Sequence, residues 1–167
     1  MSLLKHLRIE QTAIMGHSLG GMVAMAVAQQ AQAARELILL EGWNSLQATS
    51  AFGAEHHFGG LSEESKALVK QQFSAVSNGV GKEHWAIFWR SVEEFSAEKF
   101  RKETRMPILD IYGSIGCAPS TPEMLQLPHH LQQKICWLDG TGHYLHKQKP
   151  EMIANHCRCF LAHSDTN

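Results

Sequence analysis

The sequence lacks long hydrophobic runs, clusters of basic residues and a dense cysteine pattern. No stretch approaches the roughly 18 consecutive apolar residues that a membrane-spanning helix needs. The formal net charge is −1 and the lysines and arginines are scattered, so nothing indicates binding to nucleic acid or to an anionic membrane. Four cysteines are too few for a disulfide framework and favour free thiols in a reducing compartment: Cys117, Cys136, Cys157 and Cys159.

Metal-ligand spacings are also missing. The eleven histidines are scattered, no His-Glu-x-x-His occurs, and Cys157 and Cys159 are too close and too isolated for half a zinc site. Adjacent histidines such as His56 and His57 point apart and make poor metal pairs. The sequence therefore predicts neither a metal nor a cofactor. The apolar run near the N-terminus is too short for a signal peptide, so we expect a soluble, cytoplasmic protein.

Four apolar runs of strand length alternate with helical stretches. They are TAIM (12–15), ELILL (36–40), ILDIY (108–112) and KICWL (134–138). Strands that alternate with helices need crossover connections, so the order predicts an α/β fold with a mostly parallel sheet and helices on both faces. The length of 167 residues suits one domain.

Helices are expected to begin and end near Leu3–Leu7 and Ser18–Ala33, and a last helix is expected to start near Pro150, a residue suited to the first helical position. Apolar residues recur at helical spacing in the last helix, and we expect this stripe to pack against the core. Its members are Met152, Ile153, Cys157, Phe160 and Leu161.

A long segment separates the second and third expected strands. Residues 44–105 are too many for a simple crossover, have a helical pattern and hold most of the aromatic residues. Ser62 is the expected N-cap of one helix in this segment. We therefore expect residues 1–43 and 106–167 to form the core and residues 44–105 to form a small helical cap.

The segment TAIMGHSLGGMVAMA places a Gly-x-Ser-x-Gly pattern between an expected strand and an expected helix. The turn must be tight, with Ser18 at its apex in a strained backbone conformation. Glycine is expected at Gly16 and Gly20 because side chains there would collide with the neighbouring strand and helix. The turn would lift the Ser18 hydroxyl clear of the backbone and aim the N–H of Leu19 at an oxyanion. The alternative is a glycine-rich helix cap with an inert serine.

A serine nucleophile needs a base, and His143 is the best-placed histidine. It lies in WLDGTGHYLHKQKPE, after the last expected strand and before the last expected helix. That position is at the same edge of the sheet as Ser18, and sites of open parallel sheets form at this edge. The alternative is that His143 is a turn residue. The other histidines are expected to be solvated or structural.

The segment GHSLGG, with GTGHYLHKQKPE further along the chain, resembles the α/β-hydrolase superfamily, in particular its capped, esterase-like members. The resemblance covers the whole chain but only the second half of the family's fold. The expected strands take the place of the family's fifth to eighth strands, and the insertion falls where the family has its cap. The resemblance implies a nucleophile elbow, with Ser18 as nucleophile, His143 as general base and Leu19 as oxyanion donor.

Two features depart from the family's pattern. The family's second oxyanion donor comes from the loop after its third strand, which has no counterpart in this sequence. The acid usually follows the seventh strand, where Gly116 and Cys117 stand here. Some members place the acid one strand after the nucleophile, as Glu41 is placed, although a strand-end carboxylate without a catalytic role is an equal alternative. Asp110, inside a strand, and Asp139, before a turn, are less well placed.

Two functions are consistent with these residues. The first is a serine hydrolase acting on a carboxylic ester or related acyl compound, in which Ser18 attacks, His143 moves the proton and Glu41 orients His143. The aromatic cap favours a small apolar acyl or aryl ester as substrate. The serine argues against dehalogenase chemistry, which uses a carboxylate nucleophile in this family.

The second function is that of a truncated, catalytically weak or inactive module that acts by binding or oligomerisation. The TAIM strand would lie at a bare, apolar edge of the sheet, and such an edge invites pairing with another chain. We therefore expect a homo-oligomer, or a partner chain that supplies the missing strands. A reading frame upstream of Met1 that encodes those strands would make the chain a fragment of a longer hydrolase.

Overall fold

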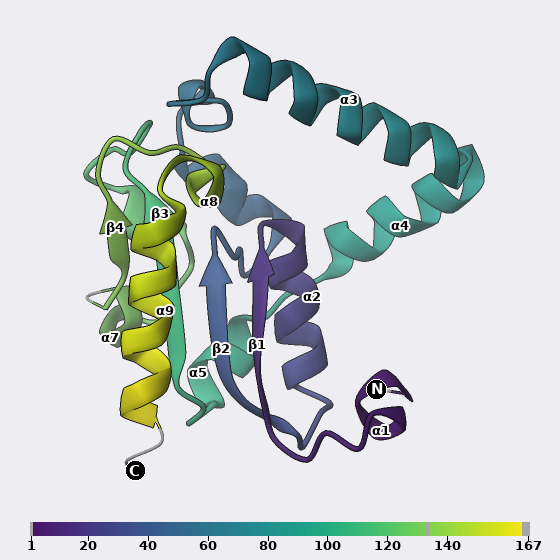
Figure 1. The fold of residues 1–167 in the computed structure, drawn as a ribbon, viewed down its shortest axis with the longest axis vertical. Helices are drawn as coiled ribbons and strands as arrows, with labels where there is room; N and C mark the ends of the chain where they lie inside the picture. Colours follow the sequence, from purple (N-terminus) through teal and green to yellow (C-terminus); the bar gives the residue numbers. More distant parts are fainter. Residues whose placement is uncertain (1, 133, 165–167) are drawn as a thin grey trace.

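A computed structural model describes residues 2–132 and 134–164, and its strands form one parallel sheet (Figure 1). The strands are β1 (Thr12–His17), β2 (Ala34–Leu40), β3 (Ile108–Gly113) and β4 (Cys136–Leu138). They lie in the order β1-β2-β3-β4, and each neighbouring pair is parallel. The expected parallel sheet is confirmed, and β1 is an edge strand among the described residues.

Helices precede, connect and follow the strands. Those outside residues 44–105 are α1 (Ser2–His6), α2 (Leu19–Ala28), α6 (Thr121–Met124), α7 (His129–Gln132), α8 (Leu145–Gln148) and α9 (Pro150–Ser164). The prediction that α2 continues to about Ala33 is wrong, because the chain has to turn before it enters β2. Within the described residues, no helix combines the length and apolar character needed to cross a membrane.

The strand β2 supports helices on both faces of the sheet. Leu37 and Leu39 pack in one cluster with residues of α2, whereas Ile38 and Leu40 pack in another with residues of α9. Successive side chains of a strand point to opposite faces, so the continuous apolar run of β2 is buried on both sides. The expected layers of helix, sheet and helix are confirmed.

The apolar stripe of α9 packs against the sheet with one exception. Ile153 and Cys157 are buried in the cluster that holds Ile38, and Phe160 and Leu161 pack against that cluster. Met152 is 43% exposed, so the prediction that it belongs to the core is wrong. It lies one residue before Ile153, and a step of one residue turns the side chain about 100° around the helix, away from the sheet.

The segment 44–105 leaves the sheet after β2 and returns to it before β3. It contains the 3-10 helices η1 (Leu46–Ala51) and η2 (Ala54–His56) and the α-helices α3 (Glu63–Val80), α4 (Lys82–Glu94) and α5 (Glu98–Glu103). Ser62 caps α3 as expected, since its Oγ accepts a hydrogen bond from the N–H of Ser65 at 3.2 Å.

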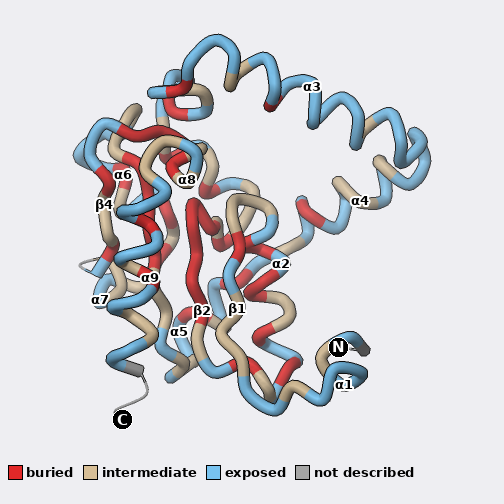
Figure 2. The backbone as a smooth tube through the Cα atoms, in the orientation of Figure 1, coloured by how far each residue is buried: buried red, intermediate tan, exposed pale blue. Residues whose placement is uncertain are grey.

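The helices α3 and α4 form a hairpin that projects from the sheet (Figure 1). Figure 2 shows that most of this hairpin is exposed. Its two helices meet through aromatic rings, with the centroids of Phe73 and Trp85 5.9 Å apart. The assignment of residues 44–105 as a cap stays a prediction.

A buried ion pair connects α5 with β3. Arg101 donates a hydrogen bond from Nη2 to Oδ2 of Asp110 at 2.6 Å, and both side chains are buried. Asp110 shares a face of the sheet with its register partner Leu39, which packs in the cluster with α2. Asp110 therefore neutralises Arg101, which agrees with the expectation that it is poorly placed to act as the acid of the site.

Candidate functional site

Ser18 lies at the turn between β1 and α2. Its backbone angles, φ 55° and ψ −123°, lie outside the regions that residues other than glycine favour, so the expected strain is confirmed. The side chain makes no capping hydrogen bond to α2. Because α2 begins at Leu19, the N–H of Leu19 has no acceptor within the helix and can bind an oxyanion.

The glycines of the motif differ in their surroundings. A Cβ on Gly16 would overlap the carbonyl group of Gly20, and a Cβ on Gly21 would lie 2.7 Å from the Cα of Gly42. The prediction that Gly20 avoids a collision is wrong, because a Cβ there would meet no described atom within 4 Å. Gly16 and Gly21 are thus the residues that let α2 approach the ends of β1 and β2.

The backbone after β1 brings Ser18 to the edge of the sheet where His143 lies. His17, the residue before Ser18, donates from Nε2 to the carbonyl oxygen of His143 at 2.8 Å, and the two rings have centroids 4.7 Å apart. In the described part of the chain no hydrogen bond joins the Ser18 hydroxyl to His143. Such bonds are often long in ligand-free enzymes and shorten when substrate binds.

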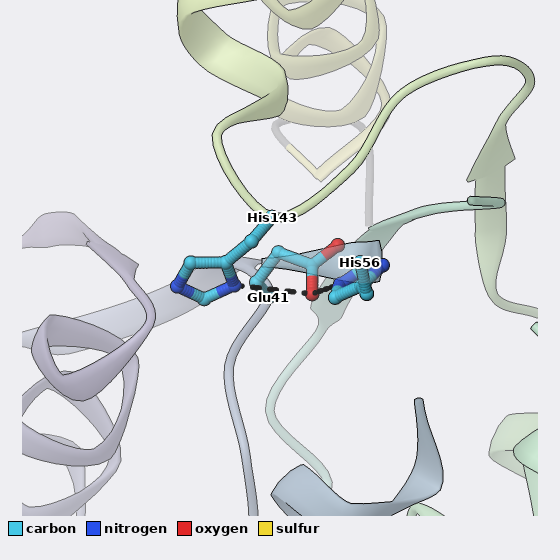
Figure 3. Close-up of side chains that lie close together, drawn as sticks. All are labelled: Glu41, His56 and His143. Carbon is cyan, nitrogen blue, oxygen red and sulfur yellow. Dashed lines mark hydrogen bonds and ion pairs between the residues drawn. The ribbon is translucent and has the colours of Figure 1, made fainter. Parts of the chain in front are cut away.

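Glu41 follows β2 and faces His143. Its Oε2 lies 3.5 Å from Nδ1 of His143 (Figure 3), and both side chains are buried. This distance is within ion-pair range but long for a hydrogen bond, and Nδ1 has no hydrogen-bond partner within residues 2–132 and 134–164. A movement of about half an ångström would bring the pair to hydrogen-bond distance.

The Glu41 carboxylate is held from several sides. Its Oε1 accepts a hydrogen bond from the N–H of Gly113 at 2.6 Å, and its Oε2 lies 2.8 Å from Nε2 of His56. Burial alone would raise the pKa of Glu41, but the imidazoles of His143 and His56 and the Gly113 N–H outweigh burial and lower it. The carboxylate is therefore ionised at neutral pH.

His56 is a site residue that the sequence analysis missed. It is 4% exposed, its ring stacks on Phe52 with centroids 3.8 Å apart, and Nδ1 lies 2.6 Å from the carbonyl oxygen of Ile115. The expectation that this histidine is either solvated or merely structural missed its contact with Glu41. No spacing pattern links the two residues, because they meet only through the path of η1 and η2.

Aromatic rings surround His143. Trp43 and His57 each stack on it, with centroids 5.0 Å and 5.2 Å away, and Tyr144 meets it edge to face at 5.1 Å. Burial, together with the nearby His143, lowers the pKa of His17 to about 4. His17 is therefore neutral at pH 7 and adds no positive charge next to the His143 ring.

The residues at the family's usual acid position do not supply a carboxylate. Gly116 adopts a positive φ of 76° in the loop after β3. Burial, together with the charge of Glu41, raises the pKa of Cys117 to about 11, so its thiol is neutral at pH 7. Asp139 accepts a hydrogen bond from the Ser114 hydroxyl at 3.1 Å at an exposed turn. Among the carboxylates considered from the sequence, Glu41 is the one in contact with His143.

Comparison with known proteins gives a fold-level likeness. Neither a protein-family model nor a curated protein sequence matches the chain. A solved enzyme that degrades N-acyl homoserine lactone matches with a TM-score of 0.63 and 15% identity, over 95% of this chain and 70% of that chain. An α/β-hydrolase from the metagenome of sediments of the Mar Chica lagoon, Morocco, matches with a TM-score of 0.67 and 17% identity, over 98% of this chain and 67% of that chain.

An esterase from Rhodococcus sp. ECU1013 matches with a TM-score of 0.59 and 15% identity, over 96% of this chain and 68% of that chain. Identities this low establish the fold and leave the reaction open. The parallel sheet, the strained serine between β1 and α2, and these neighbours lead to one conclusion. The chain has the α/β-hydrolase fold, and it spans 67–70% of the length of these solved structures.

Proposed function

We propose that the chain is an esterase-like serine hydrolase that acts on a carboxylic ester or a related acyl compound. The observation that carries the proposal is the approach of the buried His143 and Glu41, Nδ1 to Oε2 at 3.5 Å, at the sheet edge that Ser18 reaches. A serine, an imidazole and a carboxylate in that order form the arrangement that activates a hydroxyl for acyl transfer.

In the proposed reaction, the Ser18 Oγ attacks the acyl carbonyl while Nε2 of His143 takes the hydroxyl proton. The N–H of Leu19 donates to the oxyanion of the tetrahedral intermediate. The intermediate collapses to an acyl-serine when His143 returns the proton to the leaving alcohol. Water then attacks the acyl group with His143 again as base, and the product acid and free Ser18 are released. Throughout, the Glu41 carboxylate stabilises the imidazolium of His143.

The expected rate depends on the number of oxyanion donors. Leu19 supplies one, and the family's second donor comes from a loop without a counterpart in this chain. Loss of one donor lowers kcat by about 10²–10³. We therefore propose slow hydrolysis by the chain alone, and faster hydrolysis in an assembly that supplies another donor.

A small apolar acyl or aryl ester is the proposed substrate. The support is the set of rings near the catalytic imidazole, which would contact an apolar group better than a charged one. Trp43 and His57 stack on His143, and the ring of Phe58 stacks on Tyr144 with centroids 6.3 Å apart.

A fluorophosphonate probe tests the proposal, because it forms an adduct only with an activated serine. The folded chain should be labelled at Ser18 and should hydrolyse p-nitrophenyl butyrate, and Ser18→Ala should abolish both. Ser91→Ala is the control, since this exposed hydroxyl bonds only its own helix, to the carbonyl oxygen of Phe88. Absence of an adduct on the folded chain would contradict the proposal.

The second candidate function is assembly through the free side of β1. The supporting observation is that β1 is an edge strand among the described residues, with its own Met15 53% exposed and Val23 of α2 57% exposed. Unpaired strand edges of this kind pair readily with another chain. We propose a homo-oligomer or a partner that adds strands there. Sedimentation at micromolar concentration should show an assembly that Met15→Lys weakens, and a wild-type monomer would contradict this function.

A further inference from the structure

Glu41, His56 and His143 form a compact group of metal-binding side chains at the site. One ligand atom from each lies within 4.8 Å of those of the other two, and all three residues are buried. Figure 3 shows the Glu41 carboxylate between the two imidazole rings. Glu41, His56 and His143 are far apart in the sequence, so ligand spacing predicted no metal site.

Two of the three separations between ligand atoms come close to those of a tetrahedral ion, and the nitrogens of His56 and His143 lie within 4.8 Å of each other. Zinc bonds to nitrogen and oxygen are about 2.0–2.2 Å long, which places neighbouring ligand atoms about 3.3–3.5 Å apart. Nδ1 of His143 lies 3.5 Å from Oε2 of Glu41 and meets this condition. Nε2 of His56 lies 2.8 Å from the same oxygen and would move out by about half an ångström.

The hydrogen bonding of His56 requires a cation at this point. Nδ1 lies 2.6 Å from the carbonyl oxygen of Ile115, which can only accept, so Nδ1 carries the proton. In a neutral ring, Nε2 would then direct its lone pair at the Glu41 carboxylate, 2.8 Å away. Two acceptors at that distance repel each other unless a second proton or a metal ion lies between them. A backbone carbonyl on the far nitrogen is also the contact that commonly orients a metal-binding histidine.

His143 supplies the second, independent observation. Its Nδ1 is buried, faces Glu41 and has no hydrogen-bond partner within the described residues. Buried polar atoms without partners are uncommon, and a bound ion is one of their ordinary explanations. A metal ion would satisfy this nitrogen and Nε2 of His56 at once.

We propose that Glu41, His56 and His143 bind one divalent transition-metal ion of the zinc type, with a further coordination position left for water. Two imidazole nitrogens and one carboxylate oxygen suit Zn²⁺ or Co²⁺, whereas Mg²⁺ and Ca²⁺ prefer sites made of oxygen ligands. The ion would bind to the lone pair of Nδ1, which leaves the proton of a neutral His143 on Nε2.

The effect of this ion on hydrolysis rests on the proposed function. In the hydrolytic mechanism, Nε2 of His143 must accept the proton of Ser18, and Glu41 must remain free to stabilise the imidazolium. An ion bound to Nδ1 of His143 and to Glu41 prevents both the proton transfer from Ser18 and the stabilisation of the imidazolium by Glu41. The metal-bound and hydrolytic states are therefore mutually exclusive, and Zn²⁺ acts as a reversible inhibitor.

Calorimetric titration of the EDTA-treated wild-type chain with Zn²⁺, and visible absorption with Co²⁺, test the metal site directly. We expect one ion per chain at this site, a Co²⁺ spectrum of low coordination number, and a higher unfolding temperature with Zn²⁺. His56→Gln and Glu41→Gln should each weaken binding by at least about 10–100-fold. His57→Gln is the matched control, because this neighbouring histidine stacks on His143 but is not part of the ligand group.

Ser18→Ala separates the two proposals, because it should abolish hydrolysis and leave the Zn²⁺ affinity unchanged. Circular dichroism spectra establish which variants fold, and the effect of Zn²⁺ on the unfolding temperature of the wild-type chain does not depend on any variant. A wild-type chain that binds no ion would overturn the inference. So would ion binding that survives in folded His56→Gln, since the ion would then occupy other histidines or cysteines.

Discussion

Alanine substitutions at the two neighbouring glycines of α2, Gly20 and Gly21, should affect stability differently. A Cβ on Gly21 would lie 2.7 Å from the Cα of Gly42, whereas a Cβ on Gly20 would meet no described atom within 4 Å. The obstacle at Gly21 is backbone, which cannot move aside as the end of a flexible side chain can. Gly21→Ala therefore has to push α2 away from the end of β2, and Gly20→Ala does not.

The expected magnitude follows from two contributions. Alanine in place of glycine favours a helix by up to about 1 kcal/mol at either position. Forcing an extra methyl group into a packed site costs about 1–3 kcal/mol, and only Gly21→Ala incurs this cost. The helix contribution is nearly common to both variants, so Gly20→Ala should be more stable than Gly21→Ala by about 1–3 kcal/mol.

Urea unfolding followed by circular dichroism measures the difference, provided that the slope of unfolding free energy against urea is the same for both variants. Gly20→Ala should raise the urea midpoint above that of the wild-type chain. The midpoint of Gly21→Ala should lie well below that of Gly20→Ala. Equal midpoints for the two variants would refute the close approach of α2 to Gly42. Lower stability of Gly20→Ala than of the wild-type chain would contradict the open space around this position.

Other predictions concern the buried ion pair, a cysteine and the acid of the site. Arg101→Met should destabilise the chain by about 3–5 kcal/mol in urea unfolding, because it leaves the Asp110 charge buried and unpaired, and the further change Asp110→Leu should restore part of the loss. With a pKa raised to about 11, the Cys117 thiol is almost wholly protonated at pH 8. In a Cys159→Ser background, the rate of Cys117 alkylation should rise about tenfold per pH unit until the pH reaches this pKa. Fast alkylation at pH 8 would exclude the raised pKa. Glu41→Gln should lower kcat for p-nitrophenyl butyrate by about 10³–10⁴ if the carboxylate orients the base, and an unchanged kcat would assign it a structural role.

The sheet could be predicted from the sequence because its strands are continuous apolar runs. A run such as ELILL is buried on both faces, and a parallel sheet between two layers of helices provides that environment. The end of α2 was less predictable, since residues 29–33 have no glycine or proline and the turn is imposed by the return to β2. The requirement for glycine at Gly20 was also wrongly predicted, because which face of α2 meets the sheet depends on packing.

The site could be predicted only in part. Ser18 and His143 carry local patterns, a tight strand-to-helix turn and a glycine-rich loop before a helix, and the structure places both at one edge of the sheet. Glu41 could be proposed from its place at a strand end. His56 could not, because its contact with Glu41 depends on the path of residues 44–55, for which hydrophobic periodicity gives no information. The roles of these residues in catalysis stay predictions.

The side of β1 that pairs with no strand of the described residues borders the turn that carries Ser18. A strand donated by a neighbouring polypeptide would run next to Thr12–His17 and end where Ser18 begins. A chain that docks along this edge would thus help to shape the surroundings of Ser18. Because dilution would dissociate such a complex, the specific activity of an esterase built in this way would rise with protein concentration in the assay.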